Sequence, residues 1–133
     1  MLDYPQVALD FMNRDHAEFI ELRKELLGLL TRQAADAEVD ALLDKLLRHT
    51  RRHFAEEERL MQAAQFPPYL MHKTEHDRVL ADMESRIAQW RQQRDAGALR
   101  QYAEEALADW FTGHVGMMDL VTAKFIAAQQ KAA

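Results

Sequence analysis

The sequence contains no cysteine. This absence excludes disulfide bonds, zinc sites built on thiolates, iron–sulfur clusters and cysteine nucleophiles. A metal bound by this chain must therefore be held by histidine, aspartate and glutamate. The chain has six histidines and 22 acidic residues that could serve.

Glycine and proline are also scarce, with 4 and 3 residues, which disfavours a turn-rich all-β fold. No apolar run approaches the ~18 residues needed to cross a bilayer, so we expect no membrane span. Residues 1–5 have neither the basic nor the apolar region of a signal peptide, so we expect a cytoplasmic protein.

Positive charge is in deficit, because the formal net charge is −5. An acidic chain without a long basic run is a poor nucleic-acid binder, and we expect no nucleic-acid partner. The one basic cluster consists of Arg48, Arg51 and Arg52, and three glutamates follow it at 56–58. We interpret this cluster as a helix face in contact with solvent.

The apolar residues recur with helical spacing. The chain has 133 residues, 48% hydrophobic and 29% charged, which predicts one globular domain over 1–133. Four predicted helices cover about 5–35, about 37–65, a segment that follows Pro67 and Pro68, and a segment from about 98 onward. Pro5 suits a first helical turn. Short connections make sequential helices antiparallel, so we predict an all-α, up-down-up-down antiparallel four-helix bundle.

Histidines interrupt the apolar stripe of every predicted helix. His16, for example, falls between Met12 and Phe19. The five histidines in such positions are His16, His53, His72, His76 and His114. A buried polar group without a partner costs ~1–3 kcal/mol, and a shared metal centre would supply one partner for all five.

Two of the four helices carry pairs of candidate ligands at i, i+4. These pairs are His53 with Glu57 and His72 with His76. Residues at this spacing lie on one helix face, so both members can bind one metal or two adjacent metals.

A third pair, His114 and Asp119, has i, i+5 spacing. On a regular helix this spacing separates the side chains by roughly 140°. If Asp119 is also a ligand, the backbone must depart from a regular helix there. Gly113 and Gly116 flank this step and would permit the departure.

Five imidazoles and two carboxylates exceed the needs of one tetrahedral zinc ion. They fit two six-coordinate ions bridged by two carboxylates and one solvent oxygen, with one coordination position left over. Nitrogen and oxygen ligands in these numbers suit iron or manganese.

These motifs resemble the hemerythrin family of the HHE type, and the length is similar to bacterial single-domain hemerythrins. The motifs are a lone histidine in the first helix (Asp15-His16), HFAEE at 53–57, HKTEH at 72–76 and HVGMMD at 114–119. Together they cover nearly the whole chain, in the order found in the family.

The resemblance implies a non-haem di-iron protein that binds O₂ reversibly for transport, storage or delivery and is not an enzyme. Its cofactor would be two iron ions, Fe²⁺ or Fe³⁺, with an oxo or hydroxo bridge. One iron would have three histidines, the other would have two and an open position, and two carboxylates would bridge them. These sets are His72, His76 and His114; His16 and His53; and Glu57 and Asp119.

Apolar side chains near the predicted ligands would line the O₂ side and exclude water. They are Phe19, Phe54, Trp110, Phe111 and Val115. As ordinary bundle core, each of them could also be present without a functional role.

The chain departs from the family pattern at two positions. It lacks the N-terminal tryptophan often found in bacterial members, and His49 stands where an aromatic residue such as tyrosine is expected. We expect His49 to be a half-exposed polar residue. An inward-pointing His49 would alter autoxidation or give the site peroxidase character.

Other functions compete with O₂ carriage. The residues 72–76 match the H-x-x-E-H protease signature, but that interpretation leaves three stripe histidines unexplained. A ferritin-like oxidase needs glutamate three residues before histidine, and none of the six histidines has one. The alternatives kept are a sensor of O₂, NO or redox state that acts through an unknown protein partner, and a di-iron peroxidase or oxidase that removes peroxide.

Overall fold

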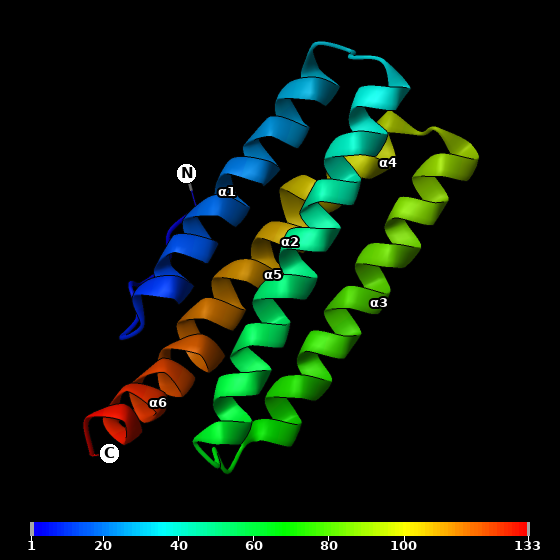
Figure 1. The fold of residues 1–133 in the computed structure, drawn as a ribbon. Helices are drawn as coiled ribbons and strands as arrows, with labels where there is room; N and C mark the ends of the chain where they lie inside the picture. The colour runs from blue at the N-terminus through cyan, green and yellow to red at the C-terminus, as the bar shows by residue number, and fades with distance from the viewer. Residues whose placement is uncertain (1, 133) are drawn as a thin grey trace.

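The computed structural model describes residues 2–132, which form helices and connecting loops and contain no strand. The first three helices are α1 (Asp10–Thr31), α2 (Asp36–Ala63) and α3 (Tyr69–Gln93). A fourth continuous helical column consists of α4 (Ala96–Gln101), the π-helical segment η1 (Tyr102–Ala106), α5 (Leu107–His114), the π-helical segment η2 (Val115–Asp119) and α6 (Leu120–Ala132). The four columns run alternately up and down (Figure 1), which confirms the predicted antiparallel bundle.

Among the helices of residues 2–132, none combines the length and the apolarity that crossing a bilayer requires.

The predicted start of the first helix near Pro5 is wrong, because α1 begins at Asp10 and Pro5 lies in an irregular segment. The Asn13 side chain makes two hydrogen bonds with the backbone of Val7 in this segment. The Val7 N–H donates to Asn13 Oδ1 at 2.8 Å, and Asn13 Nδ2 donates to the Val7 carbonyl at 2.9 Å. These bonds keep Val7 outside the helix, and its side chain is buried against the bundle.

The helix ends are set by local hydrogen bonds rather than by glycine. Gln33, Gln65 and Arg94 have left-handed backbone conformations just after α1, α2 and α3. The fourth column starts at Ala96, before the predicted residue 98, because the Asp95 carboxylate accepts a hydrogen bond from the Ala98 N–H. Such a cap supplies a partner to a free N–H of the first helical turn.

The π-helical segment η1 bonds the fourth column to α1. Arg23 of α1 donates from Nε to the Ala103 carbonyl at 2.7 Å. A π turn shifts carbonyls out of the regular i→i+4 ladder, which makes such a carbonyl available to a neighbouring helix. We found no signal for this segment in the sequence.

The end of the bundle that holds the 32–35 and 94–95 connections has an apolar interior. Its core includes Leu26, Leu30, Val39, Leu43, Leu46, Met83, Ile87, Leu99 and Leu107. Burial of such side chains contributes roughly 1.5–3 kcal/mol each, so this half helps to hold the four columns together. The opposite half contains the histidines.

Candidate metal centre

The seven candidate ligands lie together in the interior of the bundle and all are buried. Their nitrogen and oxygen atoms form two groups, each with all atoms within 4.8 Å of one another. One group is Glu57, His72, His76, His114 and Asp119, and the other is His16, His53, Glu57 and Asp119. Both groups therefore contain the carboxylates of Glu57 and Asp119.

The i, i+4 pairs on α2 and α3 face each other. Glu57 Oε2 lies 3.0 Å from His53 Nε2 on its own helix, and Glu57 Oε1 lies 3.0 Å from His76 Nε2 on α3. The His72 and His76 rings lie one turn apart and meet edge to face, with centroids 4.5 Å apart and an interplanar angle of 60°. The carboxylate of Glu57 thus lies between imidazoles of two helices.

The π-helical segment η2 brings Asp119 onto the same face as His114. The segment Val115–Asp119 begins directly after His114, and Asp119 Oδ1 lies 3.0 Å from His114 Nε2. A π turn contains one more residue than an α turn, so an i, i+5 pair becomes neighbours. The predicted departure from regular helix is confirmed.

Glycine is not the reason for this π turn. Neither Gly113 nor Gly116 has a positive φ, and a Cβ at either position would meet no atom within 4 Å. The glycines are therefore compatible with the turn but are not required for it, because neither has a positive φ.

Asp119 also reaches the first and third helices. His16 Nε2 donates to Asp119 Oδ2 at 2.9 Å, and His72 Nε2 lies 3.2 Å from Asp119 Oδ1. His72 Nε2 also lies 3.2 Å from His114 Nε2. Two imidazole nitrogens this close are compatible with a shared proton or with a shared cation.

Several of these atoms are buried without a hydrogen-bond partner within residues 2–132. They are His53 Nε2, both oxygens of Glu57, His76 Nε2 and Asp119 Oδ1. Each such atom costs about 1–3 kcal/mol when left unpaired. All of them belong to the two ligand groups, so a cation between them would satisfy the whole set, and the donor set fits a metal.

The charges of the site shift its pKa values in opposite directions. Burial alone would lower the pKa of His53, but Glu57 and Asp15 outweigh burial and raise it to about 10. Burial and Asp119 raise the pKa of Glu57, but His53 and His76 outweigh them and lower it to about 2. Without a metal, Glu57 and Asp15 thus favour the protonated form of His53, and a bound metal would release that proton.

A second layer of side chains orients three of the histidines through their Nδ1 atoms. His53 donates to Asp15 Oδ2 at 2.8 Å, His76 to Glu58 Oε2 at 2.9 Å, and His72 bonds Thr122 Oγ1 at 2.8 Å. Such bonds hold the ring and leave Nε2 pointing at the site. We did not predict these roles, although Thr122 lies one turn after Asp119 on the same helix face.

The five apolar residues predicted to lie near the ligands line one small cavity of about 20 Å³. They are Phe19, Phe54, Trp110, Phe111 and Val115. The rings are packed tightly: Phe19 stacks on Phe111 with centroids 4.7 Å apart, and Phe54 on His76 with centroids 3.8 Å apart. The volume is room for about one water-sized molecule.

Of the seven candidate ligands, His16, His53, His114 and Asp119 also line this cavity. The other three, Glu57, His72 and His76, do not line it. The cavity therefore adjoins the group that contains His16 and His53.

His49 lies at the edge of this cavity and is 8% exposed. The expectation of a half-exposed side chain is wrong, because His49 bonds to another helix: its Nε2 lies 3.0 Å from Glu18 Oε2 of α1. Burial lowers the pKa of His49, although Glu18 and Asp15 oppose this shift.

The irregular N-terminal segment also contacts the site, which the sequence did not indicate. The Tyr4 ring is edge-on to His16, with centroids 6.2 Å apart, and to Phe111, with centroids 5.2 Å apart. An aromatic ring therefore covers His16 although the chain lacks an N-terminal tryptophan.

Comparison with known proteins agrees with this geometry. Residues 7–125 match the family model described as the hemerythrin HHE cation binding domain. A bacteriohemerythrin of Aquifex aeolicus is 31% identical over 114 residues, 86% of this chain and 86% of that protein. A bacteriohemerythrin of Ralstonia nicotianae is 35% identical over 116 residues, 85% of this chain and 77% of that protein. No solved structure matches the chain.

Proposed function

The chain belongs to the hemerythrin family, and we propose that it binds O₂ reversibly at a pair of iron ions. The observation that carries the proposal is the pair of ligand groups that share Glu57 and Asp119. Two groups with two common carboxylates suit two metal ions bridged by those carboxylates. Five imidazoles and two carboxylates favour iron or manganese over a single zinc.

The position of the cavity indicates that the two ions would have different roles. Three histidines, His72, His76 and His114, would hold one iron, and two, His16 and His53, would hold the other. The ion with fewer protein ligands would have room for a further ligand, and the cavity adjoins His16 and His53. O₂ would therefore bind on the cavity side.

When bound, two ferrous ions supply the electrons that O₂ takes up. The residues of the chain exclude water from the site and orient the histidines. Phe19, Phe111 and Val115 are buried and apolar, so they exclude water and anions from the cavity. Asp15 and Thr122 hold their histidines in one ring orientation, which preserves the site between cycles.

An O₂ titration of the reduced, iron-loaded protein tests the proposal. We expect about two irons per chain by metal analysis, a visible charge-transfer band that appears with O₂, and loss of this band under argon. One zinc per chain, or oxidation that argon does not reverse, contradicts it. Sustained consumption of added peroxide would favour the peroxidase alternative.

Two histidine variants form a matched pair for the metal analysis. His72→Ala removes a ligand from the buried cluster, so we expect loss of iron. His49→Ala removes a buried histidine outside both of the shared-carboxylate groups, so we expect its iron content to stay at the level of the unmodified chain. Equal iron losses in both variants would show general unfolding instead of loss of a ligand.

A further inference from the structure

His49 separates two hollows of the molecule. A groove of about 640 Å³ lies on the surface between α1 and α2, and the small apolar cavity of the candidate centre lies inside. Among the residues that line either hollow, His49 is the one common to both. The two residues next to His49 in the chain each line only one of the hollows. Arg48 lines the groove but not the cavity, and Thr50 lines the cavity but not the groove.

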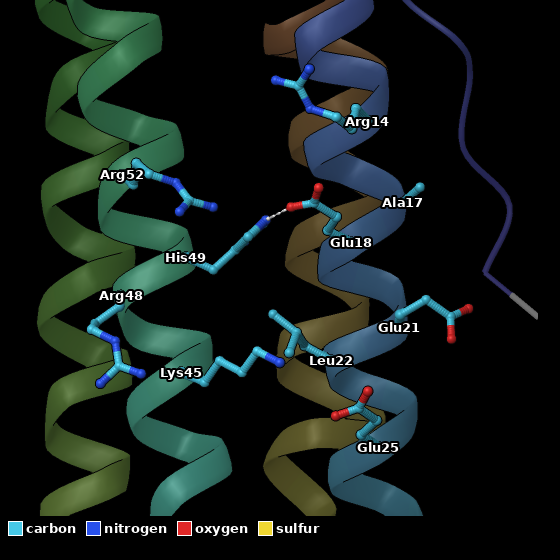
Figure 2. Close-up of a pocket in the computed structure, with 10 residues that line it drawn as sticks. All are labelled: Arg14, Ala17, Glu18, Glu21, Leu22, Glu25, Lys45, Arg48, His49 and Arg52. Carbon is cyan, nitrogen blue, oxygen red and sulfur yellow. Dashed lines mark hydrogen bonds and ion pairs between the residues drawn. The ribbon is translucent and has the colours of Figure 1, made fainter.

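Figure 2 shows the imidazole of His49 crossing the groove from α2 toward the Glu18 carboxylate on α1, to which it is bonded. The side chain of Glu18 is 45% exposed, so the outer end of this bond is in contact with solvent. An exposed side chain changes rotamer rapidly, so Glu18 can release the buried His49. The pair can therefore open without disturbing the helices.

The other walls of the cavity are harder to move. Phe19 and Phe111 are buried and stacked on each other with parallel rings. Phe54 is buried and stacked on His76. Displacing a packed aromatic ring exposes apolar area and opens a void. His49 is also buried, but it is the wall residue bonded to an exposed carboxylate that can move away.

We propose that small uncharged ligands reach the cavity through the groove between α1 and α2, and that His49, held by Glu18, gates this route. The inference rests on the proposed function for the identity of the ligand, O₂. The apolar lining of the cavity disfavours ions, which selects for neutral ligands. His49 therefore determines how fast a ligand enters and leaves, and the metal ligands determine how tightly it is held.

Rapid-mixing kinetics of the reduced, iron-loaded protein with O₂ test the gate. A gate lies on the path in both directions, so opening it changes association and dissociation equally. For His49→Ala we expect both rate constants to rise roughly fivefold, as for a barrier lower by about 1 kcal/mol, with their ratio unchanged. Glu18→Ala, which breaks the same bond from its exposed end, should raise both by a smaller factor.

A change in the dissociation rate alone would overturn the gate, because it would place His49 in contact with bound ligand. Unchanged rates in both variants would also overturn it. Arg51→Ala is the matched control, since Arg51 lies on the same helix as His49 but lines neither the groove nor the cavity, and we expect its rates to equal those of the unmodified protein.

A second readout needs no iron. The chain has two tryptophans, and Trp110 lines the cavity. In a Trp90→Phe background, quenching of Trp110 fluorescence by dissolved O₂ reports how readily O₂ reaches it. We expect more quenching for His49→Ala in the full chain without added iron, with helix content checked by circular dichroism. Unchanged quenching overturns the route. Increased quenching in a chain that fails to bind O₂ at iron supports the route and refutes only the proposed function.

Discussion

The two halves of the bundle are built by the same four columns but differ in the chemistry of their interiors. Near the 32–35 and 94–95 connections, shown at the top of Figure 1, the interior is leucine, methionine and other apolar residues. Toward the start of α1 and α3, imidazoles and carboxylates are buried beside apolar residues such as Met12, Met61 and Ile126. One interior is filled with apolar side chains, while the other also contains buried polar atoms without a hydrogen-bond partner within residues 2–132, which a cation would satisfy.

Because of this difference, we expect metal removal to destabilise mainly the half that contains the histidines. A ligand that binds only the folded state stabilises it by about 4 kcal/mol at a thousandfold excess over Kd. We expect chelation to lower the unfolding temperature and to speed amide hydrogen exchange around the histidines, while amides near Leu43 and Ile87 stay protected. Hydrogen-exchange mass spectrometry with and without iron measures this. Equal loss of protection in both halves would contradict the division.

A substitution in the apolar half should lower the stability of the protein without changing its metal content. Leu43 is 1% exposed and belongs to the apolar core. We expect Leu43→Ala to lower the free energy of unfolding by about 2–5 kcal/mol through the lost burial and the cavity it leaves. The metal content of the folded protein should not change. Urea unfolding and metal analysis measure the two effects.

Leu70→Ala is the matched control for this substitution. Leu70 is 72% exposed, so the same chemical change should alter the free energy of unfolding by no more than about 0.5 kcal/mol. Loss of metal from folded Leu43→Ala would show that the two halves are coupled more closely than their separate interiors indicate.

The predictability of the two halves from sequence differs as well. Periodicity places both the apolar residues and the histidines on inward faces, because a side chain's face depends on helix geometry alone. This is why His16 and His114 could be assigned to the interior without a structure. The same reasoning predicted the irregular turn between His114 and Asp119, since no regular helix brings them together.

Periodicity could not predict individual side-chain contacts, either in the irregular N-terminal segment or between different helices. The bonds of Asn13 with Val7 move the start of α1 past Pro5, and the bond with Glu18 buries His49. The π-helical turn at Tyr102–Ala106 joins no candidate ligands, so spacing offered no reason to expect it. Such features depend on which helix faces meet, and that information lies in the packed bundle.

The apolar half also has an ion cluster at its rim, and its contribution should depend on pH. Asp40 accepts from Trp90 Nε1 at 2.8 Å and from Arg94 at 2.7 Å. The bond from Arg94 lowers the pKa of Asp40 more than burial raises it, with Trp90 adding to the lowering. Its stabilisation is therefore full above the ordinary aspartate pKa and is lost as the pH falls through the lowered value.

We expect Asp40→Asn to destabilise the chain by about 1 kcal/mol at neutral pH. The difference from the unmodified chain should shrink as the pH falls below the lowered pKa of Asp40. Urea unfolding at several pH values, with chelator present in every sample, isolates this effect from metal binding. A difference that stays constant down to that range would contradict an ionised Asp40 as its origin.

The smallest predicted effect concerns the backbone of the polar half. Gly113 directly precedes His114, has no positive φ, and would place a Cβ in open space. Alanine at a helical position stabilises by roughly 0.5–1 kcal/mol over glycine. We therefore expect Gly113→Ala to raise the free energy of unfolding by about that amount, with the iron content unchanged. Loss of iron instead would mean that the turn to Asp119 needs the freedom of glycine, and that the polar half is held by a special backbone as well as by its metal.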